Sequence, residues 1–530
     1  MVPGFRGDWR DDAEARAVYS EAAGIARIMP MAVAVPADPG DVVTLVRWAA
    51  STGTPLIPRG SGSSMAGGAI GSGVIVDLGR LNAIGAIDAA HRRVRVGPGA
   101  IAARVDRAAA GVGLRFPVDP SSWEFCTVGG MAATNAAGAH SFRFGPMRAW
   151  VTALDCVFAD GTRAVVRRGD PPPVLPAISR FSADIGSRLA SPPSHLGVRK
   201  DSSGYDVAGY AKSGELIDLL VGSEGTLAIF VGLELALIPR PAATASILAV
   251  FPSLDSAVAG TSAVRAAGPG IVACELLDRT FLDVAASGGA GPSLPAGTEA
   301  VLLIELEDST PGDLVEALQT AGATLVELAL DPDAEHRLWA LRHAASPILS
   351  RLDPALKSMQ FIEDGAVPPD QLAEYVRGVR AALARQAVRG VIFGHAGDAH
   401  VHVNPLIDVR LPDWRRRLDA VLAEVTALTA RLGGTLTGEH GDGRLRTPLL
   451  GTVWPESAIG LFTRVKQAFD PRAILNPGVK VTLPGQVPVV DVKYDPALPA
   501  LPGAAAAALA RVERDRAYAT PRLALLADPS

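Results

Sequence analysis

The residues best suited to chemistry lie in two short glycine-rich segments in the C-terminal half of the chain. The first, VIFGHAGDAHVHVN, begins at Val391, and the second, TGEHGDGRLR, begins at Thr437. Together they contain His395, His400, His402, His440 and Glu439. Imidazole and carboxylate ligands without thiolates are typical of Zn²⁺, Mn²⁺ or Fe²⁺ sites. The two segments predict a divalent metal site; the alternative is that the histidines only satisfy local hydrogen bonds.

These side chains need elements that position them. The first segment predicts a strand, a tight Gly-x-x-Gly turn and a second strand. Side chains repeat with period two along a strand, so His400 and His402 should share one face, with His395 close by at the turn. Glu439 can supply a further ligand. His440 would then lie next to the metal as a base.

A second unusual feature lies within the stretch Leu56 to Leu78: the loop between Ile57 and Val74 has six glycines, four serines and one charged residue, Arg59. Free backbone N–H groups in such a loop form an anion-binding concavity, and the expected guest is a phosphate or pyrophosphate. The loop lacks the lysine of a P-loop, and it leads into a strand rather than a helix, unlike the dinucleotide fingerprint. The alternative is a flexible surface loop or hairpin.

Small residues also dominate the stretch from Phe116 to Gly145. Such a run permits close approach to a flat ligand, with hydrogen bonds from the backbone and from Asn and Thr side chains. Taken alone, the stretch favours tight helix–strand packing. From Trp150 to Val166 the pattern predicts a β-hairpin that turns at Asp160-Gly161.

Composition limits the class of protein. The chain has 530 residues, 48% of them hydrophobic, so more than one domain is expected. A net charge of −5 gives no reason to expect nucleic acid. Three distant cysteines exclude a disulfide framework and an iron–sulfur array. The polar, acidic N-terminus is not a signal peptide, so we expect a cytoplasmic protein, either free or peripheral to a membrane.

The chain divides into four parts by composition and periodicity. Residues 1–33 are expected to form an N-terminal helical segment, and residues 34–241 and 242–480 to form two domains. In the first domain, a helix should begin with Asp41 as N-cap and end at Gly53. The second alternates strand-like with helix-like runs, an α+β pattern. Residues 481–530 are expected to be a peripheral arm without a site.

Six motifs in order along the chain resemble the FAD-linked oxidase family: PRGSGSS, FPVDPSS with VGGMAATNAAG, VGSEGTL, FGHAGDAHVHVN, GEHGDGR and FDPRAILNPG. That family includes D-lactate dehydrogenases, the large subunit of bacterial glycolate oxidase and D-2-hydroxyglutarate dehydrogenases. The resemblance covers about residues 30–480. It implies a vanillyl-alcohol-oxidase-type (PCMH-type) FAD-binding domain of two α+β subdomains, followed by an α+β cap domain that closes over the flavin.

The resemblance also implies which residues bind FAD, without a covalent link as in the hydroxy-acid members. The pyrophosphate would be held by Pro58, Arg59, Gly60, Ser61, Gly62, Ser63 and Ser64. The isoalloxazine and ribityl chain would be lined by Pro120, Ser121, Gly129, Gly130, Thr134, Asn135 and Gly138. Glu224, Gly225 and Leu227 would lie near the adenine half, and Asn476 close to the flavin.

For the reaction, the resemblance implies a divalent metal, Zn²⁺ or else Mn²⁺ or Fe²⁺, bound by His395, His402 and Glu439. Arg342 would hold the carboxylate of a D-2-hydroxy acid, and His440 would act as general base while hydride passes to the flavin. Many members have an asparagine where this chain has His400, which either adds a ligand or takes the place of that asparagine. Lactate, glycolate and 2-hydroxyglutarate are all compatible substrates.

The most similar long members of the family carry an iron–sulfur half that this sequence does not contain. Electrons are therefore expected to leave to a separate iron–sulfur subunit, a cytochrome or a quinone. A homodimer is compatible with the sequence. The alternatives are an O₂-using oxidase of the same fold, a non-redox enzyme similar to the ether-lipid synthases, and a flavin-binding subunit retained for assembly.

Overall fold

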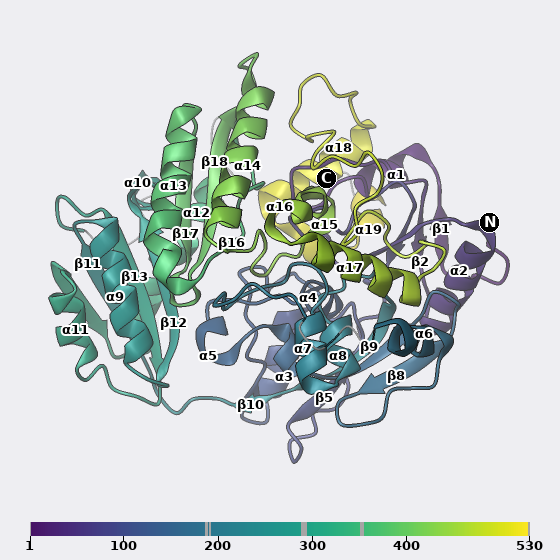
Figure 1. The fold of residues 1–530 in the computed structure, drawn as a ribbon, viewed down its shortest axis with the longest axis horizontal. Coiled ribbons are helices and arrows are strands. Elements are labelled where there is room, and N and C mark those ends of the chain that lie inside the picture. Colours follow the sequence, from purple (N-terminus) through teal and green to yellow (C-terminus); the bar gives the residue numbers. More distant parts are fainter. Residues whose placement is uncertain (1, 186–188, 190–191, 288–293, 350–354, 528–530) are drawn as a thin grey trace.

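The computed structural model describes residues 2–185, 189, 192–287, 294–349 and 355–527. Figure 1 shows two lobes, one formed by the first half of the chain with its C-terminal end, the other by the middle of the chain. Helices and strands mix in both lobes, so the α+β prediction is confirmed. No helix in the described part of the chain is long and apolar enough to cross a membrane.

The first sheet carries the glycine loop. Its order is β1 (Asp8–Arg10), β2 (Ala32–Val35), β4 (Val74–Asp77), β3 (Leu56–Arg59), and both β2 and β3 run parallel to β4. The loop connects β3 to β4, as expected. A buried row of Leu56, Val74 and Val76 packs against α2 (Pro39–Thr52). Because β3 and β4 run parallel, the loop leaves the sheet at one end of this strand pair and returns at the other, Val74 pairing with Leu56.

The structure corrects the predicted start of α2. Its N-cap is Asp38, whose carboxylate accepts from the N–H groups of Gly40 and Asp41 at 2.8 and 3.2 Å. Asp41 lies inside the helix, and its carboxylate accepts from the N–H of Ala37 at 2.9 Å. The helix ends at Gly53 with a φ of 71°, as predicted.

The second sheet is antiparallel, in the order β5 (Arg93–Val96), β9 (Ile229–Ala236), β7 (Val151–Val157), β8 (Arg163–Arg167). The predicted hairpin is confirmed as β7 and β8. Around this sheet lie α3 (Ala102–Ala110), α4 (Val128–Thr134), α6 (Pro176–Ile185), α7 (Val207–Ser213) and α8 (Leu216–Leu220). Helix α4 brings the second small-residue stretch next to the glycine loop, because the side chain of Thr127 reaches the backbone of Gly60.

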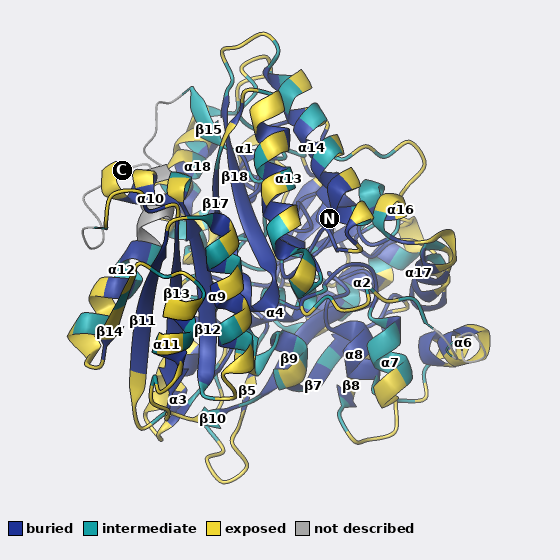
Figure 2. Cartoon of the chain, turned by 60° about the vertical axis from the view of Figure 1, so that its left-hand side comes forward, coloured by how far each residue is buried: buried dark blue, intermediate teal, exposed yellow. Residues whose placement is uncertain are grey.

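The cap domain is one antiparallel sheet. Its order is β14 (Leu325–Ala329), β11 (Thr244–Phe251), β13 (Ala300–Glu307), β12 (Ile271–Asp278), β17 (Arg389–His395), β18 (His400–Asp408), β15 (Leu356–Ser358), with β16 (Gly365–Ala366) also paired to β18. One face is covered by α9 (Leu254–Ala266), α11 (Leu314–Thr320), α13 (Leu372–Arg385) and α14 (Trp414–Arg431). The other is covered by α10 (Arg279–Ser287) and α12 (Pro332–Leu349). Figure 2 shows these strands buried between helices whose outer faces are exposed.

The chain returns to the first lobe before residue 480. Helix α16 (Leu450–Val453) and α17 (Glu456–Phe469) contribute Leu450, Phe462 and Phe469 to the core around the second sheet. Leu475 pairs with Leu56 of β3. The last part of the expected 242–480 segment therefore packs on the first lobe, through the apolar faces of these helices.

The ends of the chain also differ from the prediction. The N-terminal segment has one helix, α1 (Ala13–Val18), and the strand β1. The expected peripheral arm forms α18 (Gly503–Asp515) and α19 (Arg522–Ala527). Their buried residues Ala505, Ala508 and Leu525 pack with α1 and β2. The arm is thus part of a core rather than an appendage.

Candidate active site

One cavity of about 780 Å³ extends along both lobes. Most of the predicted site residues line it: Pro58, Arg59, Gly60, Ser61, Gly62, Ser63, Ser64, Pro120, Ser121, Gly129, Gly130, Thr134, Glu224, Gly225, Arg342, His395, His402, Glu439 and His440. Four others are described by the structure but lie outside that lining: Asn135, Gly138, Leu227 and Asn476. The cavity therefore joins the glycine-rich stretches to the histidine-rich ones.

The glycine loop offers backbone and hydroxyl groups to this cavity. The carbonyls of Gly62 and Ser64 accept from the N–H groups of Ala23 and Gly24, so the loop is anchored through its oxygens. Gly62 has a φ of 74°, where glycine is favoured. The hydroxyl of Ser64 is buried and has no hydrogen-bond partner among the described residues. Such donors fit a phosphate group.

Arg59 lines the cavity, but its guanidinium points into the protein. It donates to the backbone carbonyls of Tyr19 and Glu21 at 3.2 and 2.9 Å and is almost fully buried. The Arg59 side chain therefore stabilises the start of the loop. Its positive charge lies behind the loop and does not face a ligand in the cavity.

Behind the loop, buried polar groups join the two halves of the chain. The carboxylate of Glu224 accepts from the N–H groups of Asp442 and Gly443 at 2.7 and 3.0 Å and pairs with Lys480 at 3.1 Å. The amide of Asn476 donates to the carbonyls of Gly68 and Glu224. Asn476 therefore supports the loop from outside the cavity.

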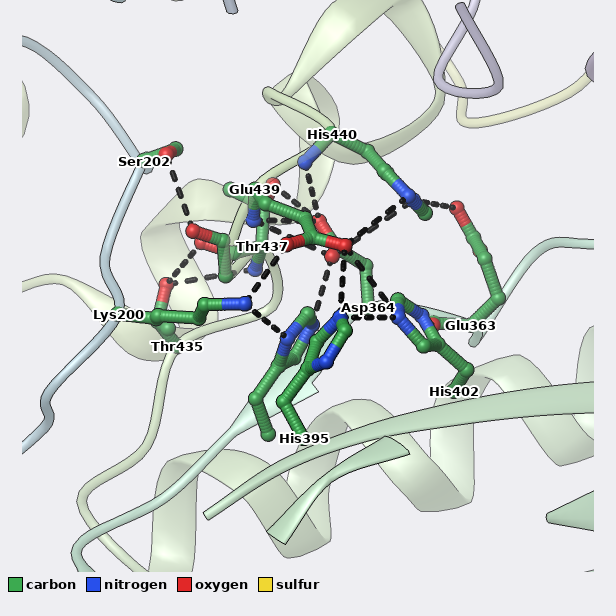
Figure 3. A network of polar contacts seen from close by, with 12 residues as sticks. Lys200, Ser202, Glu363, Asp364, His395, His402, Thr435, Thr437, Glu439 and His440 are labelled. Atoms are coloured by element: carbon green, nitrogen blue, oxygen red, sulfur yellow. Dashed lines mark hydrogen bonds and ion pairs between the residues drawn. The ribbon is translucent and has the colours of Figure 1, made fainter. Parts of the chain in front are cut away.

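At the other end of the cavity, three side-chain atoms form a triangle (Figure 3). The Nε2 atoms of His395 and His402 lie 3.3 Å apart, and each lies 3.3 Å from Oε1 of Glu439. Ligand atoms bound at ~2.1 Å in a tetrahedral site lie roughly 3.4 Å apart. The three atoms are therefore spaced to bind one divalent cation.

The hydrogen bonds of the two imidazoles also favour a bound cation. His395 donates from Nδ1 to Oε1 of Glu275 at 2.6 Å, and His402 donates from Nδ1 to the carbonyl of Glu363 at 2.8 Å. Donation from Nδ1 leaves Nε2 available as a ligand atom, the usual arrangement around bound metals. Burial opposes protonation of His395, but Glu275 and Glu439 outweigh it and raise its pKa to about 9. The two carboxylates therefore make the surroundings of His395 favourable for a positive charge.

Two further residues lie next to the triangle. His400, left open as a ligand, lies on the same strand, but its Nε2 is 2.8 Å from the carboxylate of Asp364. Lys200 is buried and donates to Oε2 of Glu439 at 2.7 Å. Both hold the Glu439 segment in place. Lys200 comes from a polar loop 239 residues away from Glu439, with no pattern that marks it.

His440 points to the same place and is held by two carboxylates. Its backbone N–H donates to Asp364 at 2.9 Å, and its Nδ1 lies 3.3 Å from Glu363. Arg446 pairs with both acids. Burial opposes the protonated ring, but the charge of Asp364 and the hydrogen bond to Glu363 outweigh it and raise the pKa of His440. Its ring stacks on that of His402 at 5.3 Å.

Arg342 completes this end of the cavity. Its Nε donates to Oε2 of Glu275 at 2.7 Å, and its guanidinium lies over the ring of Phe393 at 4.7 Å. Glu275 thus holds Arg342 with one oxygen and His395 with the other. Sequence reasoning missed Glu275 because it lies on β12, 120 residues before His395. One buried carboxylate therefore holds both the Arg342 guanidinium and one corner of the triangle.

The fold and the cavity define an FAD-binding oxidoreductase with a cap domain, and the comparisons agree. Residues 30–167 match the FAD binding domain model, and residues 240–479 match the model of FAD linked oxidases, C-terminal domain. The glycolate oxidase subunit GlcD of Bacillus subtilis is 32% identical over 88% of this chain and 93% of that protein. The chain therefore belongs to the FAD-linked oxidase family.

Other relatives differ in the activity their names give. The D-lactate dehydrogenase of Archaeoglobus fulgidus is 28% identical over 84% of this chain and 90% of that protein. The D-2-hydroxyglutarate dehydrogenase of Pseudomonas putida is 29% identical over 90% of this chain and 50% of that protein. Among solved structures, 4-ethylphenol oxidase from Gulosibacter chungangensis has a TM-score of 0.65 at 17% identity, covering 90% of this chain and 94% of that one. That likeness supports the fold.

Proposed function

We propose that the protein oxidises a D-2-hydroxy acid of the D-lactate, glycolate or D-2-hydroxyglutarate type to the 2-oxo acid, using FAD and a divalent metal, and passes the electrons to a separate acceptor. The observation that carries the proposal is the triangle of ligand atoms in the same cavity as Arg342 and the glycine loop. Named relatives act on glycolate, D-lactate and D-2-hydroxyglutarate.

The residues have separate tasks. Arg342 binds the carboxylate of the acid, and its orientation is fixed by Glu275 and Phe393. His440 accepts the proton of the α-hydroxyl, and Glu363 and Asp364 stabilise the imidazolium that results. His395, His402 and Glu439 would hold the cation. When bound, the cation supplies Lewis acidity toward the hydroxyl, and FAD supplies an acceptor for two electrons.

We also propose that FAD is bound without a covalent link. The loop that would hold its pyrophosphate contains no histidine or cysteine. The second small-residue stretch, which also lines the cavity, contains His140 and Cys126. His140 has one ring nitrogen 2.8 Å from Asp119 and the other 3.2 Å from Glu305. Burial raises the pKa of the Cys126 thiol to about 12, which makes it a poor nucleophile. Acid precipitation should release all flavin into the supernatant, whereas flavin in the pellet would contradict this.

The acceptor is proposed to be a separate iron–sulfur subunit, cytochrome or quinone. The three cysteines of the chain, Cys126, Cys156 and Cys274, are all buried and free. A cluster bound by thiolates needs several of them together. Stopped-flow mixing of reduced protein with air-saturated buffer tests this proposal. Slow reoxidation is expected, while reoxidation as fast as turnover, with stoichiometric peroxide, would favour an oxidase.

The experiment that tests the function is anaerobic reduction of the flavin by a panel of acids. D-Lactate, glycolate, D-malate and D-2-hydroxyglutarate are each mixed with metal-loaded protein, and the visible absorbance is followed. At least one should bleach the flavin, and for each chiral acid the L-enantiomer should not. If no 2-hydroxy acid bleaches a flavin that dithionite still reduces, the proposed function is wrong.

A further inference from the structure

The C-terminal arm, residues 481–527, lies beyond residue 479, where the match to the FAD linked oxidase C-terminal domain ends. The arm contacts both lobes. Val489 and Val492 pack in the core of the cap, and the carbonyl of Val490 accepts from Arg415 of α14 at 3.1 Å. Further on, α18 and α19 pack on α1 and the first sheet. The arm therefore spans from one lobe to the other.

Between these two anchors the arm faces the cavity. Tyr518 stacks on Phe125 with ring centroids 5.2 Å apart, and the guanidinium of Arg516 lies over the same ring at 4.9 Å. Tyr494 donates from its hydroxyl to Glu513 at 2.6 Å. On the cap side, the ammonium of Lys357 lies 5.0 Å from the centre of the Tyr494 ring. The arm is thus one wall of the cavity.

Exposure locates the opening of the cavity. Among the described residues that line it, five are exposed to solvent: Ser121, Ala510, Glu513, Arg514 and Arg516. Four of these five belong to the end of α18 and the residue that follows it. Residues that both line a cavity and face solvent lie at its mouth, so the arm forms most of the rim.

The rim has two cationic residues and one anionic residue, although the chain has a net charge of −5. Glu513 is bonded to Tyr494 and lies 4.0 Å from Lys493, and Arg514 is paired with Asp515. Arg516 has no carboxylate partner among the described residues. It adopts a φ of 54°, unusual for a side chain of this size, and so ends α18 beside Phe125. An unpaired guanidinium at a mouth lined by Lys357 attracts anions.

We propose that the arm forms the entrance of the cavity, and that Arg514 and Arg516 select the anions that enter it. This inference rests on the proposed function for the identity of the anion, a small 2-hydroxy carboxylate. Charged walls around an opening raise the local concentration of ions of opposite sign and the rate at which they arrive. The arginines determine which ligands enter, while Arg342 binds the carboxylate inside.

The test uses quenching of flavin fluorescence in the FAD-loaded protein by iodide, an anion, and by acrylamide, which is neutral. Ionic strength is kept constant, because salt screens the effect. The double variant R514Q/R516Q should lower the ratio of the iodide to the acrylamide quenching constant at least about threefold, and R514E/R516E should lower it further. R163Q, which removes a charge that is not part of the cavity lining, and R516K should both behave as wild type.

A second readout separates this inference from the proposed function. For an acid that reduces the flavin, R514Q/R516Q should lower kcat/KM with kcat unchanged, and the difference should vanish at high salt. If the quenching ratio falls but no acid reduces the flavin, the proposed role of the arm at the entrance is supported and the proposed function is wrong. The refuting outcome requires that R514Q/R516Q and R514E/R516E fold correctly, with melting temperatures like that of the wild type. If both then keep the wild-type quenching ratio, the proposed role of the two arginines is wrong.

Discussion

The two ends of the cavity are lined by different kinds of chemical group. The glycine loop presents backbone groups and small hydroxyls, and its one charged residue, Arg59, is turned away from the cavity. The other end presents histidine, glutamate and arginine side chains. Buried groups hold them in turn: Glu275 holds His395 and Arg342 with its side chain, and Glu363 holds His402 with its backbone carbonyl.

This difference has consequences for substitution. A site made of backbone groups depends on the path of the chain, so it tolerates changes of side chain that leave the path unaltered. A site made of side chains fails when one ligand or one of its supports is removed. We therefore expect substitutions at the two ends to separate binding of FAD from reaction with substrate.

The largest effect is expected from Glu439→Gln. The amide is a weaker ligand than the carboxylate and also loses the ion pair with Lys200, which is 2.7 Å away. The variant should lose bound metal and reduction by substrate, while retaining the flavin spectrum. Metal analysis and anaerobic absorbance measure the two properties. Glu424→Gln, a half-buried acid of α14 paired with Arg385, is the control. Full reduction by metal-free Glu439→Gln would refute the ligand assignment.

His440→Ala should come next. A general base contributes ~10²–10⁴-fold to rate, whereas substrate binding should depend mainly on the metal ligands and Arg342. Single-turnover reduction should slow by that factor with a small change in the apparent dissociation constant. His91→Ala, an exposed histidine paired with Asp88, is a suitable control. Slowing of less than about tenfold would show that His440 is not the base.

Glu275→Gln tests the support rather than the ligand. The carboxylate orients His395 and Arg342 together, at 2.6 and 2.7 Å. Loss of a partner that orients a metal ligand typically lowers metal affinity by ~10–100-fold. We expect that decrease, with a rise in KM as Arg342 loses its orientation. Competition with a chelator measures the affinity. Unchanged affinity and KM would mean that Glu275 has only a structural role.

The smallest effect on the reaction should come from Gly60→Ala at the other end. A Cβ at Gly60 would lie 2.1 Å from Oγ1 of Thr127, so the loop must shift. The variant should release FAD several-fold faster, yet its remaining FAD-loaded fraction should react normally. Flavin fluorescence after dilution measures release. Gly460→Ala, with open space around its Cβ, is the control. A slower reaction in the FAD-loaded fraction would contradict the separation of FAD binding from reaction between the two ends.

Local patterns predicted the elements that carry the site. The alternation of His400 and His402 indicated β18, and the glycine loop was correctly placed between β3 and β4. The contacts of the supporting residues could not be predicted in this way. Glu275, Lys200 and Asp364 meet the histidines only because distant segments fold together.

The division of the chain shows the same limit. A change in composition indicated where the cap begins, and β11 starts there, at Thr244. No local signal indicated that α16 and α17 return to the first lobe. The alanine-rich run of the arm was equally uninformative, because Ala505 and Ala508 are buried only through contacts with α1 and β2. Which faces pack together is a property of the whole fold.

The central claim is that the triangle of His395, His402 and Glu439 binds a metal needed for reduction of FAD in the same cavity. The most direct test follows flavin absorbance in one anaerobic sample. Protein freed of metal by a chelator is mixed with a D-2-hydroxy acid that reduces the metal-loaded protein, and Zn²⁺ or Mn²⁺ is then added in excess. We predict a stable flavin spectrum before the addition and bleaching after it. Bleaching at full rate in the metal-free protein would contradict the account.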